Sequence, residues 1–129
     1  LIDVHPPLYD LASIHLYPQQ PESRFGASDT APAELLALSV DACRPAGKAL
    51  FVGEFGVSQE ACQGDPDRIR ELFDRTLHDI TQSGAALAAL WVFDFRSQDK
   101  NWNVTADNHR AWMLDAVAAA NRQLRAAGK

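Results

Sequence analysis

A short run of residues from Ala49 to Gly56 (Ala-Leu-Phe-Val-Gly-Glu-Phe-Gly) places one carboxylate where an enzyme would need it. Apolar residues lead to Glu54, which stands between Gly53 and Gly56. Enzymes built on barrels of parallel strands carry their catalytic groups at the C-terminal ends of those strands. Glycine lets the backbone or a ligand approach closely. Glu54 is therefore the first candidate for a catalytic residue; the alternative is an ordinary strand that ends at a glycine turn with Glu54 in solvent.

Two neighbouring apolar segments carry polar and aromatic side chains that could join Glu54. Because successive side chains of a strand point to opposite faces, His15 and Tyr17 share one face of their strand. The same face of the predicted sheet would then gather an imidazole, a phenol, a carboxylate and the indole of Trp91. Each has an ordinary alternative: a hydrogen-bonded core histidine, a strand end before Pro18, a core tryptophan. All of these would have to hold on three strands at once, which favours a site.

The same alternation predicts which side chains lie on each face of the strand that carries Glu54. The site face should hold Leu50, Val52 and Glu54. The face toward the helices should hold Phe51, Gly53 and Phe55.

Three strands alternate with three helices along the chain. The predicted strands cover about 11–17, 49–55 and 86–95, and the predicted helices about 32–44, 66–82 and 108–126. A loop rich in Pro, Gly and Ser should run from Pro18 to about Asp29. The second helix has the clearest signals, because Asp65 is a good N-cap, Pro66 suits the first turn and Gly84 follows the end. Apolar strands alternating with helices predict an α/β fold with parallel strands.

Length and composition limit what such a fold can be. The 129 residues form one domain, 1–129, near half of the ~250 residues typical of an eight-stranded (β/α)8 barrel. Three strand–helix units cannot close that barrel, so the expectation is a partial TIM barrel. The unpaired backbone groups of an edge strand tend to pair with another strand. We therefore expect either a remaining barrel segment or a second copy of the chain to cover the open sheet edges. The N-terminus lacks signal-peptide features and resembles the middle of a larger chain.

Several function classes fit the composition poorly. The net charge of -5 argues against a nucleic-acid partner, which needs clustered Lys and Arg. No apolar run is long enough to span a membrane. Cys43 and Cys62 are expected on opposite faces of the sheet and therefore unpaired, so they indicate no compartment. No zinc spacing is predicted, because the histidines are scattered at His5, His15, His78 and His109.

The motifs His15-Leu16-Tyr17, Gly53-Glu54-Phe55-Gly56 and Trp91, in this order, resemble the C-terminal part of clan A glycoside hydrolases. The closest likeness is to glycoside hydrolase family 5, the cellulase-like (β/α)8 barrels. The resemblance covers nearly the whole chain and matches the last three strand–helix units. It implies the C-terminal part of a retaining β-glycosidase, which would hydrolyse O-glycosidic bonds in a β-linked glucan, mannan or glucoside without a metal or organic cofactor.

The resemblance also implies roles for single residues. Glu54 matches the nucleophile, and Tyr17 matches the hydroxyl that orients it. His15 matches a histidine that lines the sugar subsite, and Trp91 matches the aromatic platform beneath the sugar. The chemistry agrees, since a retaining glycosidase needs a carboxylate at the anomeric carbon and sugar C–H faces stack on indole.

One part of the family's machinery is not in this sequence. Retaining hydrolysis needs two carboxyl groups about 5 Å apart, and the family's acid/base glutamate follows an asparagine. No Asn-Glu pair occurs here, and four further glutamates are expected as solvated charges: Glu22, Glu34, Glu60 and Glu71. The acid/base is therefore expected from outside this chain.

Two further residues extend the candidate site. Trp102 lies in a polar loop, where it forms either an extra sugar platform or a buried anchor for that loop. Asp94 follows the strand of Trp91, where it either binds sugar hydroxyls or caps backbone groups. Two other functions remain open: a carbohydrate-binding remnant without turnover, and a structural half-barrel that assembles with itself.

Overall fold

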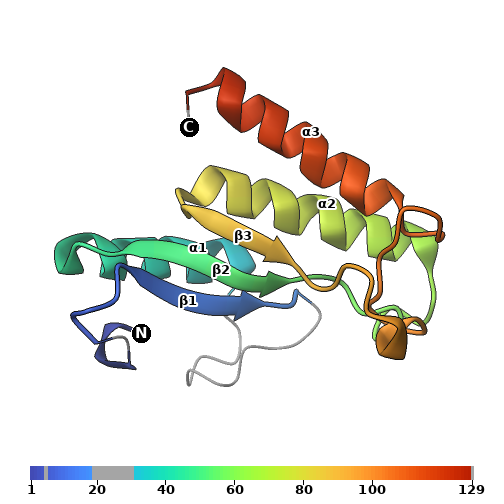
Figure 1. Cartoon of the computed structure of the whole chain (residues 1–129), viewed down its shortest axis with the longest axis horizontal. Helices are drawn as coiled ribbons and strands as arrows, with labels where there is room; N and C mark the ends of the chain where they lie inside the picture. The colour runs from blue at the N-terminus through green and yellow to red at the C-terminus, as the bar shows by residue number, and fades with distance from the viewer. Residues whose placement is uncertain (5, 19–30, 129) are drawn as a thin grey trace.

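The computed structural model describes residues 1–4, 6–18 and 31–128. Its three parallel strands, β1 (Leu11–Leu16), β2 (Ala49–Phe55) and β3 (Leu87–Leu90), form one sheet in the order β1-β2-β3. The helices α1 (Pro32–Cys43), α2 (Pro66–Ser83) and α3 (Trp112–Ala126) alternate with them (Figure 1). Short 3-10 helices are η1 (Ile2–Val4), η3 (Arg44–Ala46) and η4 (Arg96–Gln98). The predicted α/β order with parallel strands is confirmed. Most of the loop predicted from Pro18 to about Asp29, including Glu22, lies outside the described residues. His5 also lies outside them.

Helix α2 begins and ends where the sequence predicts. The Asp65 side chain accepts hydrogen bonds from the backbone N–H groups of Asp67, at 3.0 Å, and Arg68, at 3.3 Å. Pro66 occupies the first turn, and Gly84 closes the helix with a left-handed φ of 86°. These contacts satisfy backbone groups that every helix end leaves without a partner. Within the described residues, no helix is both long and apolar enough to cross a membrane.

The third strand is shorter than predicted, and the last helix begins later. Beyond Leu90, only the N–H of Trp91 still bonds to the sheet, through the carbonyl of Phe55 at 2.8 Å. The chain then pairs with its own loop, because Val104 donates to the carbonyl of Val92 and accepts from the N–H of Asp94. The predicted strand 86–95 is therefore wrong past Leu90. Turns occupy the predicted first residues of the last helix, 108–111.

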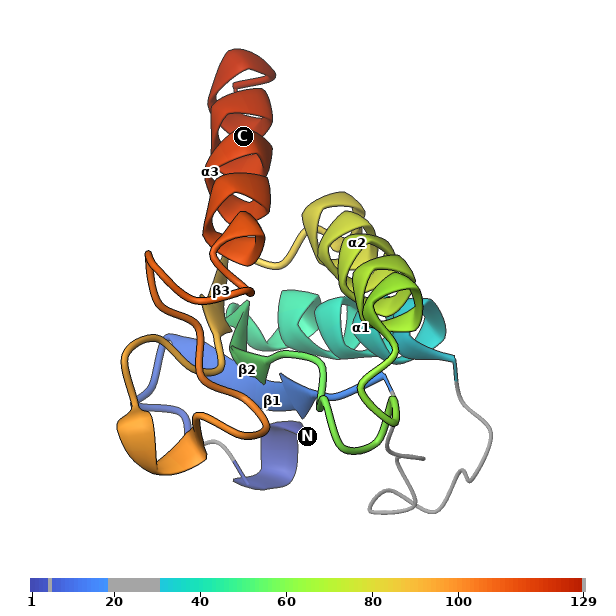
Figure 2. The same ribbon diagram turned by 90° about the vertical axis from the view of Figure 1, so that its right-hand side faces the viewer.

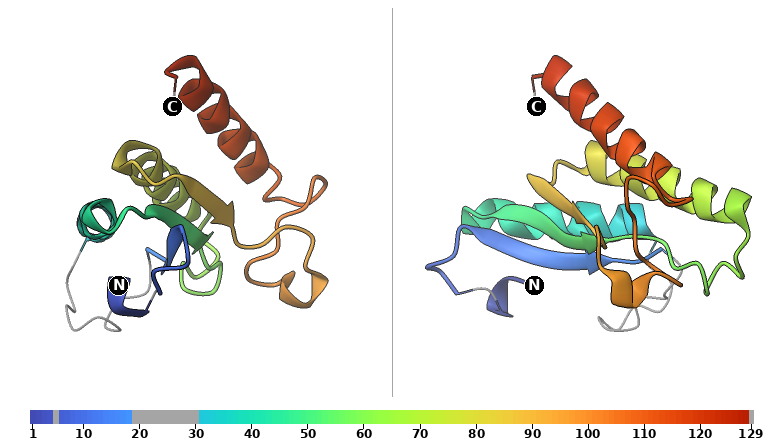
Figure 3. Two further views of the ribbon diagram at one scale, coloured as in Figure 1. Left: turned by 60° about the vertical axis from the view of Figure 1, so that its left-hand side comes forward. Right: turned by 45° about the vertical axis from the view of Figure 1, so that its right-hand side comes forward.

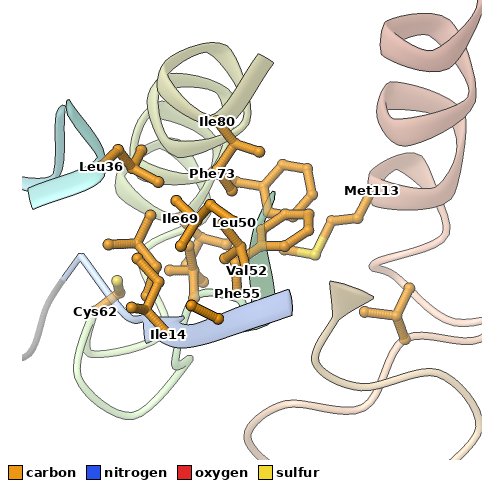
Figure 4. Packing of buried hydrophobic residues seen from close by; sticks show 14 of the residues in the cluster. Ile14, Leu36, Leu50, Val52, Phe55, Cys62, Ile69, Phe73, Ile80 and Met113 are labelled. Carbon is orange, nitrogen blue, oxygen red and sulfur yellow. The ribbon is translucent and has the colours of Figure 1, made fainter. Parts of the chain in front are cut away.

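The buried core lies between the sheet and the helices, and it corrects the predicted faces of β2. Leu50, Val52 and Phe55 are all buried at 2% exposure or less, and they pack with residues of α1 and α2 (Figure 4). The prediction that Leu50 and Val52 share the face of Glu54 is wrong. The cause is a register shift: Ile14 pairs with Val52, but His15 pairs with Glu54, so Gly53 is an extra residue. Such a bulge interrupts alternation.

The helices cover one side of the sheet and leave the other side open (Figure 2). Helix α3 is anchored at its beginning, where Trp112 packs edge-on against Phe73 of α2 at 5.2 Å between ring centroids. Met113 is its one buried residue. Farther along, α3 diverges from β3 (Figure 3). Three other apolar residues of α3, Leu114, Val117 and Leu124, are only partly buried.

Both cysteines are buried, and they are unpaired as predicted. The reason differs from the expected one, since Cys43 and Cys62 belong to the same buried cluster rather than to opposite faces of the sheet. Cys43 ends α1, ahead of β2, whereas Cys62 follows the C-terminal end of β2. Burial raises the pKa of both thiols above the ordinary cysteine value, because it disfavours the charged thiolate.

The thiols should therefore report on unfolding. Because the thiolate is the reactive species, Ellman's reagent should modify Cys43 and Cys62 slowly in the folded chain. In denaturant both thiols should react quickly, giving two per chain. Fast modification of either thiol under native conditions would contradict the buried positions.

Candidate functional site

Glu54 lies at the C-terminal end of β2 and is held by two side chains of the preceding strand–loop unit. The Tyr17 hydroxyl donates a hydrogen bond to Oε2 of Glu54. His15 Nδ1 lies 3.1 Å from the same oxygen, with 47% of the His15 side chain and 25% of the Glu54 side chain exposed. A carboxylate oxygen only accepts, so Tyr17 is the donor in its bond with Glu54, and the His15 ring adds a close polar contact to the same oxygen. The predicted grouping of Glu54, His15 and Tyr17 is present.

The extra residue in β2 makes this grouping possible. Gly53 and Glu54 both turn toward the face of His15, and a Cβ atom on Gly53 would lie 2.6 Å from Ser13 Oγ and 3.4 Å from the His15 ring. The tight contact is with the Ser13 hydroxyl, whereas the His15 ring would lie at an ordinary van der Waals distance from such a Cβ atom. The same extra residue returns Phe55 to the core, so Glu54 reaches the open face without any apolar side chain being lost to solvent.

Trp102 reaches this group from the loop after β3. Its ring packs edge-on against the Tyr17 ring, with 5.0 Å between the centroids. It also lies across Gly56, where an added Cβ would meet the indole at 3.5 Å and the Trp91 carbonyl oxygen at 2.5 Å. These contacts fit the anchoring role weighed for Trp102, and they set its ring against the phenol that binds Glu54.

Trp91 follows β3 and makes its described side-chain contacts with its own loop. Its indole Nε1 donates to Oε1 of Gln98 at 3.0 Å, and its ring lies edge-on to Phe95 at 6.5 Å between centroids. Its backbone N–H bonds to Phe55, the residue after Glu54. The peptide bond between Trp91 and Val92 is cis. Trp91 therefore lies just past the end of the strand next to that of Glu54, and the contacts given for its ring are with Gln98 and Phe95.

Asp94 lies in a separate hollow of about 670 Å³ whose lining comes from residues 93–109. Its backbone adopts a left-handed φ of 50°, and its N–H donates to the carbonyl of Val104. The side chain is exposed. The structure places Asp94 with the loop after β3 rather than in contact with Glu54, and sugar binding by Asp94 stays a prediction.

The other described glutamates are exposed, as expected for solvated charges. Glu34 lies on α1, Glu60 lies in the loop after β2, and Glu71 on α2 pairs with Arg75 one turn along. Among the described residues, no cluster of three or more His, Cys, Asp or Glu side chains could hold a metal ion.

Sequence reasoning missed the residues that fasten the two loops around the site. Ser58 Oγ, after β2, donates to the side chain of Asn101, after β3, at 2.7 Å. The side chain of Gln59, also after β2, accepts from the buried Arg110 side chain at 2.6 Å. Burial lowers the pKa of the Arg110 guanidinium. Gln98 binds Trp91. Polar residues of a loop carry no periodic signal, so spacing could not have found them.

The chain has the fold of part of a (β/α)8 barrel of the kind found in family 5 glycoside hydrolases. This follows from solved structures alone, because no family model matches the sequence and no curated protein does. The identities below are low and show the fold only.

The endo-β-1,4-mannanase from Thermotoga petrophila is 15% identical, with a TM-score of 0.57, over 87% of this chain and 26% of that one. The endo-1,4-β-mannanase from Rhizomucor miehei is 16% identical, with a TM-score of 0.57, over 88% of this chain and 30% of its own. A glycoside hydrolase family 5 mannosidase from Rhizomucor miehei is 11% identical, with a TM-score of 0.56, over 89% of this chain and 39% of that one. The chain thus spans between 26% and 39% of these enzymes.

Replacing Gly56 with alanine should disturb both tryptophans. The new methyl group would lie 2.5 Å from the Trp91 carbonyl oxygen, a backbone atom that cannot rotate away. We expect a loss of about 1–3 kcal/mol in the free energy of unfolding and a changed near-ultraviolet circular dichroism spectrum. Gly53→Ala is the comparison, because its nearest neighbour is a side-chain atom, Ser13 Oγ, rather than a backbone atom. Equal stability losses in both variants would contradict this reasoning.

Proposed function

We propose that the chain is the C-terminal part of a retaining β-glycosidase barrel in which Glu54 is the nucleophile. The observation that carries this proposal is the convergence of Tyr17 and His15 on one oxygen of Glu54 at the C-terminal end of a parallel strand. Barrel enzymes hold their catalytic groups at this end. The Tyr17 hydroxyl bond and the His15 ring beside it hold Oε2 in place, and within the described residues they leave Oε1 to meet a substrate.

The reaction would proceed in two displacements. In the first, a Glu54 oxygen bonds to the anomeric carbon while the bond from that carbon to the glycosidic oxygen breaks. The electron pair leaves on the glycosidic oxygen, which takes a proton from a general acid. In the second, water attacks the anomeric carbon, the same residue removes its proton as base, and Glu54 is released. A second carboxyl group about 5 Å from Glu54 is required, and we assign it to polypeptide outside these residues.

A β-linked mannan is the substrate class that we favour. The similar structures are two endo-mannanases and a mannosidase by their titles, whereas cellulase activity has no comparable support. Trp91 and Trp102 would supply the flat apolar surfaces on which sugar C–H faces stack, and the exposed His15 would line the sugar subsite. No metal or organic cofactor enters these steps.

The missing polypeptide has a suitable place to bind. In the described part of the chain β3 pairs only with β2, so its other edge is open. A mostly apolar hollow of about 760 Å³ lies beside that edge, lined from α2 by Leu77 and Ile80 and from α3 by Val117, Ala120 and Leu124. We assign this place to the remaining strands of the same barrel, since the similar enzymes have most of their length outside the match.

The nucleophile can be tested without the general acid. A 2,4-dinitrophenyl 2-deoxy-2-fluoro-β-mannoside releases a phenolate that is stable without a proton, and its fluorine slows hydrolysis of the glycosyl ester. The purified chain should acquire the sugar on Glu54, located by peptide mass spectrometry. Glu54→Gln should abolish the adduct, and Tyr17→Phe should slow its formation about tenfold, because it removes a hydrogen bond to a charged group.

Glu60→Gln is the matched control, because Glu60 is an exposed glutamate in the loop after β2. This variant should be labelled at the rate of the unmodified chain. An adduct that survives Glu54→Gln, or no adduct under conditions where the chain binds mannohexaose, would refute the nucleophile and leave the carbohydrate-binding remnant.

The binding place of the missing strands can be tested with a pair of leucines. The chain should co-purify with the co-expressed segment of the Thermotoga petrophila mannanase that lies outside the match. Leu87→Lys on the β3 edge should weaken this recovery at least tenfold, while Leu38→Lys on α1 should not, although the two leucines are 56% and 58% exposed. Homo-oligomers that are abolished by Leu87→Lys would instead identify a second copy as the occupant, and equal recovery with Leu87→Lys and Leu38→Lys would contradict binding at the β3 edge.

A further inference from the structure

We propose that Gln98 is the positioning residue that orients Trp91 and ties it to Trp102. The proposal deepens the proposed function, because it concerns how the two candidate sugar-stacking indoles are held. Gln98 lies at the end of η4, in a loop with no strand or α-helix to fix its side chains. Both tryptophans are nevertheless bound to this one residue, Trp91 by the side chain and Trp102 by the main chain.

The side chain of Gln98 supplies the acceptor that the Trp91 indole needs. An indole N–H is a donor only, and a partly buried donor without a partner costs free energy. Oε1 of Gln98 lies 3.0 Å from Nε1 of Trp91. This bond holds the ring by its edge. The contact with Phe95 at 6.5 Å is too long to fix the ring alone.

The backbone carbonyl of Gln98 gathers the segment that carries Trp102. It accepts from the N–H groups of Asn101 at 3.0 Å, Trp102 at 2.9 Å and Asn103 at 3.0 Å. Three donors on one carbonyl close the chain into a tight turn. A shift of Gln98 would therefore move the Trp102 ring, which packs on Tyr17.

The rest of the loop gives Gln98 a rigid base. Asn103 is fully buried, and its side chain accepts from the N–H of Phe95 at 2.7 Å and donates to Asp99. The N–H of Gln98 itself bonds to the carbonyl of Phe95 at 2.9 Å. The backbone of Gln98 is thus held in place. The orientation of its side-chain amide then determines the orientation of the Trp91 indole, through the hydrogen bond between them.

Two substitutions separate the hydrogen bond from the space that Gln98 fills. Gln98→Leu keeps a side chain of similar size and removes the acceptor, whereas Gln98→Glu keeps an acceptor at the same position. We expect Gln98→Leu to change the fluorescence maximum and increase acrylamide quenching, and Gln98→Glu to restore values near those of the unmodified chain. Gln82→Leu, an exposed glutamine of α2, should change neither.

The effect must pass through Trp91 if the proposal holds. In a Trp91→Phe background, Gln98→Leu should therefore leave the remaining fluorescence unchanged. In the otherwise unmodified chain, Gln98→Leu should weaken mannohexaose binding three- to tenfold in a calorimetric titration. Unchanged quenching in Gln98→Leu, or a change that persists in the Trp91→Phe background, would overturn the role of Gln98.

The two proposals fail in different ways. If the unmodified chain binds no mannohexaose, yet Gln98→Leu still alters quenching through Trp91, the positioning of the indole stands and the sugar site falls. If mannohexaose binds and Gln98→Leu alters neither binding nor quenching, the sugar site stands and the positioning role falls.

Discussion

The pairing of β1 with β2 around one extra residue is the constraint on which the site depends. With Gly53 inserted, Glu54 pairs with His15 and reaches the imidazole and the phenol, while Phe55 returns to the core. A regular strand could not do both, because alternation would send Glu54 and Val52 to the same face. The bulge therefore reconciles a hydrophobic core with a carboxylate on the open face, and a side chain at position 53 would meet the Ser13 hydroxyl at 2.6 Å.

Close backbone contact also joins the site to the loop after β3. Gly56 has room for neither a side chain nor a shift of the Trp91 carbonyl, since both the carbonyl and the Trp102 ring lie against it. The Ser58–Asn101 hydrogen bond fastens the same two loops farther out. The Tyr17 hydroxyl is thus supported from two sides: its oxygen binds Glu54, and its ring is packed by an indole that belongs to another strand–helix unit.

The sequence predicted the parts of the molecule whose signals are local or repeated. Helix α2 follows from Asp65 and Gly84, and the grouping of Glu54 with His15 and Tyr17 follows from parallel strands that end at one edge. The faces predicted for Leu50 and Val52 were wrong, because a rule of strict alternation does not allow for an inserted residue. The end of β3 was also wrong, because Val104, far along the chain, takes the backbone partners of Val92 and Asp94. Gln98 could not be predicted, since its contacts depend on the geometry of an irregular loop, which the residue types alone do not specify.

The inserted residue also makes the shape of β2 matter as much as its composition. Without Gly53 the strand would alternate regularly, with Glu54 directly after Val52, so Glu54 would still lie opposite His15 and Phe55 would still face the core. Flattening the bulge with Gly53 in place would instead turn Glu54 toward the side of Leu50 and Val52, among the apolar side chains beneath the helices. A carboxylate there would lose the Tyr17 hydroxyl, and burying such a group is costly. This cost opposes any slip of β1 against β2 that removes the bulge, so Glu54 also helps to specify the register of the sheet.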